Sequence, residues 1–159
     1  RSFGKKVTDL QKEYTKTDKY VHNWIPFPRI EGKSTEGTTV KITATKGRPQ
    51  VVVFVASWCI PCQDILAQLA NIKNEFQEHV SFTYIMAHDT EKESYKLSQK
   101  YNLSPVILAT HQILKDFHNP ALPSIYIGDR HGWIVDRYLN VDSAGIKDLR
   151  IFLSYLISF

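Results

Sequence analysis

The chain contains two cysteines, Cys59 and Cys62, and only two residues separate them. Both lie at a junction where an apolar run gives way to a helix-like pattern. A cysteine just ahead of a helix faces unpaired backbone N–H groups and a partial positive charge, which stabilise thiolate over thiol. Cys59 is therefore expected to be the nucleophile. Cys62, about one turn inside the helix, can reach the Cys59 sulfur and resolve a mixed disulfide, so the pair predicts thiol-disulfide exchange without a cofactor.

A CxxC pair can also bind a metal, and the sequence bears differently on zinc and on copper. A structural zinc site needs two further ligands, and the chain has neither a second CxxC nor two histidines at H-x₃₋₅-H spacing. Copper(I) suits soft thiolates and needs few ligands, so a copper(I)-binding and delivery module remains the alternative. An inert buried pair is expected least, because Trp58 and Pro61 flank the thiols. We assign no metal site.

The elements that position the cysteines follow from the spacing of apolar residues. Val51–Ala56 is a continuous apolar, β-branched run, typical of a central strand that is buried on both faces. A helix is expected to run from Pro61 to about His79, and Pro61 is tolerated because it falls in the first turn. The core-facing positions of this helix are Ile65, Leu69, Ile72 and Phe76.

Strands and helices alternate after this point. Val80–Ala87 is predicted to be a second buried strand. Residues 90–101 are predicted to form a helix that begins with a Thr90-x-x-Glu93 capping box. An insert follows, with a short strand at 105–108 and a short helix at 110–117. The alternation indicates an α/β domain.

Two hairpins and a closing helix complete the predicted domain. The first hairpin spans residues 29–45, and the second joins strands at 124–127 and 133–138. The closing helix is expected to be capped near Asp142 or Ser143. Its buried face consists of Ile146, Leu149, Phe152, Leu153 and Leu156.

Composition limits the class of protein. With 159 residues, of which 43% are hydrophobic, the chain can form one domain whose core needs no disulfide. Its 20 basic and 16 acidic residues are interspersed, which argues against a nucleic-acid footprint. No run approaches the roughly 18 apolar residues that span a bilayer, so we expect a soluble chain. Because the sequence begins at Arg1, it leaves open whether a signal peptide or membrane anchor precedes it.

Two segments resemble the thioredoxin superfamily. The first runs from Lys46-Gly47-Arg48-Pro49 through Cys59-Ile60-Pro61-Cys62. It is similar to the superfamily's active-site segment, in particular that of the TlpA- and ResA-like extracytoplasmic thiol-disulfide oxidoreductases. The second, Leu122–Val135, is similar to the segment with a cis-proline, a strand, an Asp-x-x-Gly turn and a strand. The resemblance covers the chain from about Phe27 to its C-terminus.

The resemblance implies an α/β fold of the thioredoxin-like, three-layer sandwich type. A mixed central β-sheet would be flanked by helices, with an N-terminal β-hairpin and an insert before the cis-proline strand. Residues 1–22 would then be an N-terminal extension and residues 23–159 the thioredoxin-like domain. The spacing of apolar residues within residues 1–20 predicts a short surface helix or a frayed lead-in.

The resemblance also implies that a second segment, around Pro123, lies beside the dithiol. Pro123 would be cis and packed against the dithiol, so that the backbone of Leu122 could pair with an extended substrate segment beside Cys59. Three residues next to the cysteines are expected to support the dithiol or to bind the substrate: Trp58, Ile60 and Pro61.

The chain lacks the acidic residues that assist proton transfer at the second cysteine in the family. Thioredoxins have a buried aspartate in the strand six residues before the first cysteine, where this chain has Val53. TlpA-like chains often have an acid and a proline after the second cysteine, where this chain has Ile65 and Ala67. Proton transfer at Cys62 is therefore expected to use water or another side chain, with Asp64 as a candidate.

The expected function is that of a thiol-disulfide oxidoreductase that reduces or exchanges disulfides of extracytoplasmic proteins. Apocytochrome c is one such substrate, which would connect the chain to cytochrome c maturation. The expected partners are protein disulfides or dithiols and an upstream redox partner, without nucleic acid, and the chain would act as a monomer. It would be periplasmic, or anchored in a membrane and facing the periplasm. A domain that binds unfolded chains without turnover is a further alternative. A peroxiredoxin is expected less, because its peroxidatic cysteine lacks so close a resolving partner.

Overall fold

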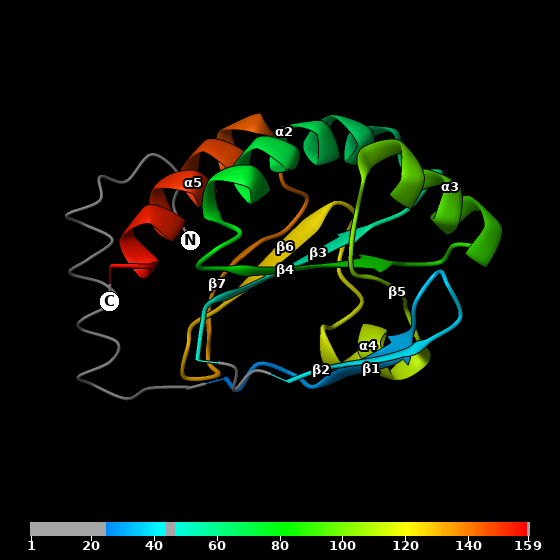
Figure 1. The fold of residues 1–159 in the computed structure, drawn as a ribbon, viewed down its shortest axis with the longest axis horizontal. Coiled ribbons are helices and arrows are strands. Elements are labelled where there is room, and N and C mark those ends of the chain that lie inside the picture. The colour runs from blue at the N-terminus through cyan, green and yellow to red at the C-terminus, as the bar shows by residue number, and fades with distance from the viewer. Residues whose placement is uncertain (1–24, 44–46, 159) are drawn as a thin grey trace.

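The computed structural model describes residues 25–43 and 47–158, and a five-stranded mixed sheet lies at its centre (Figure 1). The strand order is β5-β4-β3-β6-β7. β3 pairs in parallel with β4 and antiparallel with β6, while β5 extends the parallel side and β7 the antiparallel side. The strands are β3 (Gln50–Val55), β4 (Ser81–Met86), β5 (Val106–Leu108), β6 (Ser124–Gly128) and β7 (Ile134–Tyr138).

β3 is buried along its whole length because other layers cover both faces of the sheet. Successive side chains of a strand point to opposite faces. Val51, Val53 and Val55 accordingly pack into one core cluster, and Val52 and Phe54 into the other. The central, doubly buried strand expected from the sequence is confirmed.

Three helices cover one face of the sheet (Figure 1): α2 (Ile60–Phe76), α3 (Glu91–Tyr101) and α5 (Ser143–Leu156). α2 and α5 are joined at their surface by the guanidinium of Arg150, which donates two hydrogen bonds of 2.8 and 2.9 Å to the carboxylate of Glu75. The apolar face of α2 lies on the sheet, and both cysteines belong to this core cluster.

The other face carries the hairpin of β1 (Ile30–Lys33) and β2 (Thr39–Ile42), together with α4 (His111–Asp116) (Figure 1). Aromatic rings fill the space beneath the sheet. The ring of Phe117 lies 5.0 Å from that of Phe54 and 4.9 Å from that of Tyr126, measured between centroids. The hydroxyl of Tyr126 donates a 2.9 Å hydrogen bond to the carbonyl of Phe117, so its polar atom is satisfied within the core.

The three-layer, thioredoxin-like α/β architecture with an N-terminal hairpin is thus confirmed, and the insert supplies β5 and α4. The helix expected to reach His79 ends at Phe76 instead. The N–H groups of His79 and Val80 both bond to the carbonyl of Phe76 at 2.9 Å, which folds the chain into a turn and brings Val80 into the core. The expected helix within residues 1–22 lies outside the described residues.

Side-chain caps define the starts of the later helices. Thr90 accepts a hydrogen bond from the N–H of Glu93, as expected for α3. Of the two candidates for α5, Asp142 is the cap, and its carboxylate accepts a 2.9 Å hydrogen bond from the N–H of Gly145. No helix among the described residues is both long and apolar enough to cross a bilayer.

Burial of Tyr84 on β4 predicts a loss of stability in alkali. Burial raises the pKa of Tyr84 from 10.0 to about 12, so the folded state favours the neutral phenol. The contribution of this buried neutral phenol to the free energy of unfolding is complete below pH 10 and is lost as the pH rises towards 12. Between pH 9 and pH 11.5, we expect this loss to lower the free energy of unfolding by about 2 kcal/mol, and Tyr84→Phe to lack it.

Urea unfolding of both proteins at the two pH values measures this difference. Tyr95→Phe, which alters an exposed tyrosine, is the matched control and should follow the wild type. An identical decline in wild type and Tyr84→Phe would contradict the assignment.

Candidate active site

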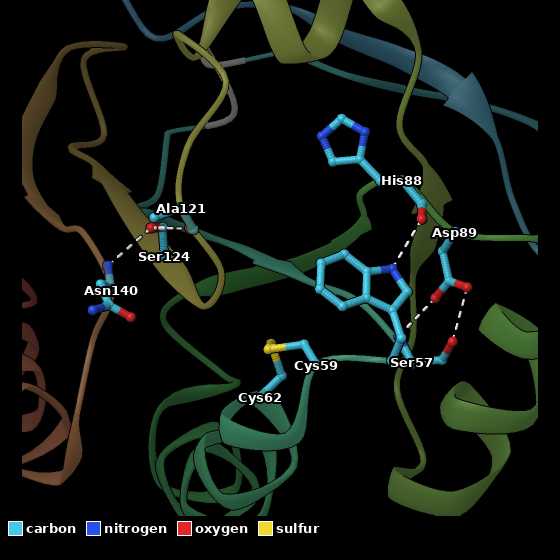
Figure 2. The surroundings of a disulfide bond; sticks show 9 residues. Ser57, Cys59, Cys62, His88, Asp89, Ala121, Ser124 and Asn140 are labelled. Carbon is cyan, nitrogen blue, oxygen red and sulfur yellow. Dashed lines mark hydrogen bonds between the residues drawn. A yellow bond between two sulfur atoms is a disulfide. The ribbon is translucent and has the colours of Figure 1, made fainter.

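The dithiol lies where β3 ends and α2 begins. Cys59 is the N-cap residue of α2, with an extended backbone, and Cys62 falls in the first turn. The two form a disulfide with a Cα–Cα distance of 5.3 Å (Figure 2). The junction expected from the sequence is therefore present, and the structure brings the two sulfurs together.

The two cysteines differ in access to solvent. Cys59 keeps 5% of its surface exposed and Cys62 none, so an incoming sulfur reaches Cys59 alone. Cys59 makes no capping hydrogen bond through its side chain, and the first turn of α2 contains no acidic residue. The partial positive charge at this helix end is therefore not offset by a carboxylate in that turn. This environment favours a thiolate at Cys59 once the disulfide is reduced.

The residues next to Cys59 in the chain carry exposed apolar side chains. Trp58 is 60% exposed and Ile60 79% exposed, although large apolar residues are usually buried. Pro61 is also exposed, in the first turn of α2. The side chains beside the dithiol thus offer an apolar surface to solvent rather than packing into the core.

The cis-proline segment borders the same end of the sheet. The Leu122–Pro123 peptide bond is cis, as expected, and Pro123 is buried while Leu122 is half-buried. Ser124 pairs with Phe54, near the end of β3 that leads to Cys59, so the antiparallel register brings this segment to the dithiol end of the sheet. The Ser104–Pro105 bond is also cis, which the sequence did not predict.

Ser124 fastens the cis-proline segment to its neighbours. Its hydroxyl donates to the carbonyl of Ala121 and accepts a 3.2 Å hydrogen bond from the N–H of Asn140 (Figure 2). Ala121 lies before β6 and Asn140 lies between β7 and α5, so the Ser124 hydroxyl joins two loops. No sequence signal pointed to this hydroxyl, because its partners are fixed only by the fold.

A second unpredicted group contacts the residues just before Cys59. The carboxylate of Asp89 and the carbonyl of His88, both in the loop after β4, accept hydrogen bonds from Ser57 and Trp58 (Figure 2). These partners are 30 or more residues apart in the chain, so periodicity could not reveal them. The predicted capping box at Thr90 located only the end of this loop.

The structure does not bring an acid to the resolving cysteine from the positions considered in the sequence. Val53 and Ile65 are buried, in the same core cluster as Cys62. Asp64 is exposed, whereas Cys62 lies on the buried face of α2, so the two point to different sides of the helix. Within the described residues, no group of three or more His, Cys, Asp or Glu side chains could hold a metal ion.

Comparisons with known proteins agree with this geometry. A model of the AhpC/TSA family matches residues 25–137. The thioredoxin-like protein YneN of Bacillus subtilis is 24% identical over 132 residues, which cover 80% of this chain and 78% of that protein.

Solved structures show the same fold. A thioredoxin-family thiol:disulfide interchange protein of Chlorobium tepidum has a TM-score of 0.75 at 17% identity, covering 87% of this chain and 99% of its own. A secreted disulfide oxidoreductase of Mycobacterium tuberculosis, homologous to Escherichia coli DsbE, has a TM-score of 0.67 at 19% identity, covering 77% and 93%. The thioredoxin-like resemblance is therefore confirmed. With a family model that matches well over half of its length and a CxxC disulfide at the start of α2, the chain belongs to the AhpC/TSA family.

Proposed function

We propose that this chain is a thiol-disulfide oxidoreductase that reduces or exchanges disulfides of extracytoplasmic proteins. The observation that carries the proposal is the unequal access to the dithiol. Cys59 keeps some exposure at a helix N-terminus whose first turn holds no acidic residue, while Cys62 is fully buried. A disulfide that only braced the fold would gain nothing from this arrangement, and it closes a loop too short to restrict the unfolded chain much.

The exchange follows from this order of access. The Cys59 thiolate attacks one sulfur of the substrate disulfide, and the other substrate sulfur leaves as a thiolate that takes up a proton. The Cys62 thiolate then attacks the Cys59 sulfur of the mixed disulfide, which releases the second substrate thiol and forms the Cys59–Cys62 disulfide. Two electrons have moved from the dithiol to the substrate. An upstream redox partner supplies two electrons to restore the dithiol.

The surroundings of the dithiol fit a polypeptide substrate. Trp58 and Ile60 offer exposed apolar area beside Cys59. The cis bond before Pro123 fits the family pattern in which the backbone of Leu122 would pair with an extended substrate segment. The names of the solved neighbours support this substrate class, since they include a thiol:disulfide interchange protein and a disulfide oxidoreductase.

The compartment and the direction of electron flow belong to the same proposal. One structural neighbour is described as secreted, which supports action outside the cytoplasm, in the periplasm or at a membrane facing it. Reduction of apocytochrome c during cytochrome c maturation is the narrower form of the proposal. The direction depends on the reduction potential of the couple relative to its compartment, and the potential of the Cys59/Cys62 pair decides whether it donates or accepts electrons.

Unequal access predicts selective alkylation of the reduced protein. Iodoacetamide should modify Cys59 at least about tenfold faster than Cys62, because Cys59 alone combines exposure with a stabilised thiolate. Mass spectrometry of the peptides after timed quenching measures both rates. In urea-unfolded protein the two rates should converge. Equal rates in the folded protein, or faster modification of Cys62, would contradict the proposed order of attack.

Removal of the nucleophile predicts loss of turnover without loss of fold. Cys59→Ser should reduce the rate of insulin reduction, with dithiothreitol as electron donor, to the background given by dithiothreitol alone. Its thermal unfolding should match that of the reduced wild type, since the core does not depend on the disulfide. Asn71→Ser, an exposed position on the same helix, should keep full activity. Full turnover by Cys59→Ser would overturn the proposed function.

A further inference from the structure

The loop that follows β4 holds the residues immediately before Cys59. One carboxylate oxygen of Asp89 accepts a 2.6 Å hydrogen bond from the backbone N–H of Ser57, and the other accepts a 2.8 Å bond from the Ser57 hydroxyl. Figure 2 shows both bonds converging on this one side chain. Hydrogen bonds to an ionised acceptor are stronger than neutral ones, so Ser57 is held at two points by a single carboxylate.

The neighbouring residue holds the tryptophan. The indole N–H of Trp58 donates a 2.9 Å hydrogen bond to the carbonyl of His88. His88 has a φ of 53°, a left-handed conformation that is uncommon for residues other than glycine. The His88 carbonyl is thus directed at the indole of Trp58. The backbone shape of the loop therefore determines where the Trp58 side chain lies.

Asp89 is itself fixed by the start of α3. The N–H of Thr90 donates a 2.8 Å hydrogen bond to the same Asp89 oxygen that binds the Ser57 hydroxyl. Thr90 in turn caps α3 by accepting from the N–H of Glu93. The carboxylate is thus anchored to a regular helix on one side and holds Ser57 on the other.

The same loop reaches towards the cis-proline segment. The imidazole Nε2 of His88 lies 3.3 Å from the side-chain oxygen of Asn119, which also has a left-handed backbone. Asn119 precedes Leu122 and Pro123 by only a few residues. The loop after β4 therefore contacts both Trp58, next to Cys59, and Asn119, in the segment that leads to Pro123.

We propose that Asp89 is a positioning residue for the polypeptide substrate. It fixes Ser57, and together with the His88 carbonyl it holds the exposed indole of Trp58 in one orientation beside Cys59. This ordered indole is the wall that the substrate contacts. This inference rests on the proposed function and deepens it by assigning a specificity role outside the CxxC segment. A wall that is already ordered spares the substrate the entropy of ordering it on binding. Loss of this order weakens the binding of substrates that contact Trp58. A small disulfide that contacts only Cys59 is insensitive to the loss.

Variants at Asp89 test the role through a comparison of substrates. Asp89→Ala should raise the KM for insulin by about 2- to 12-fold, the cost of ordering one side chain, while the rate with a small aromatic disulfide changes less than about twofold. Asp89→Asn keeps an oxygen for the Ser57 N–H and should give an intermediate KM. Hydrogen exchange of the Trp58 indole N–H, measured by NMR, should be fastest in Asp89→Ala, intermediate in Asp89→Asn and slowest in the wild type.

A pair of variants at His88 isolates the backbone contribution. Both His88→Gly and His88→Val remove the imidazole and its contact with Asn119. Glycine readily adopts the left-handed conformation, whereas a β-branched residue resists it. His88→Gly should therefore keep the indole protected and the KM close to that of wild type, and His88→Val should resemble Asp89→Ala. Equal behaviour of the two would contradict the role assigned to the His88 carbonyl.

Asp129→Ala is the matched control. Asp129 also accepts two backbone hydrogen bonds, from the N–H groups of His131 and Trp133, but in the turn between β6 and β7. It should lower the unfolding temperature without changing the KM or the Trp58 indole exchange. If Asp89→Ala leaves both readouts unchanged, or lowers both substrate rates equally, Asp89 is merely structural and the inference fails. If the wild type reduces no disulfide, the proposed function is wrong. The exchange of the Trp58 indole N–H still decides whether Asp89 positions Trp58.

Discussion

The structure depends on the meeting of a buried strand with the start of a helix. β3 is buried on both faces and so has little freedom to shift, and α2 lies over it with its apolar face in the same core. Cys59 is therefore held at the point where the unpaired N–H groups of the helix converge. The central sheet and the helices that cover it thus fix the Cys59 sulfur at the positive end of the α2 dipole.

The same burial has opposite consequences for the two cysteines. Cys62 lies in an apolar cluster with Val53 and Ile65, and burial in apolar surroundings disfavours a thiolate. In the proposed exchange, attack from outside is directed to Cys59, and the resolving step must then generate a thiolate at Cys62 in that apolar setting. Formation of the mixed disulfide brings the substrate sulfur and its surroundings next to this cluster. In the proposed exchange, water or substrate groups that enter with it would take the proton from Cys62.

Much of the fold could be predicted because its signals are local. The apolar run at β3, the capping residue Thr90 and the spacing of Cys59 and Cys62 each specify structure within a few residues. The cis bond at Pro123 came from a family resemblance, since local sequence does not specify it. The end of α2 was placed three residues too far, because a turn to the next strand depends on tertiary packing rather than on helical periodicity. The contacts of Asp89 and Ser124 join loops that are distant in the sequence, so only the folded chain shows them.

The most direct test of the account is to trap the intermediate. Cys62→Ser leaves Cys59 as the single thiol, so a protein disulfide should accumulate as a stable mixed disulfide with Cys59, visible as a covalent adduct by non-reducing electrophoresis and mass spectrometry. The reciprocal variant, Cys59→Ser, should form little or no adduct, because its remaining thiol is buried. A mixed disulfide at Cys62 that forms as fast as the one at Cys59 would contradict the account.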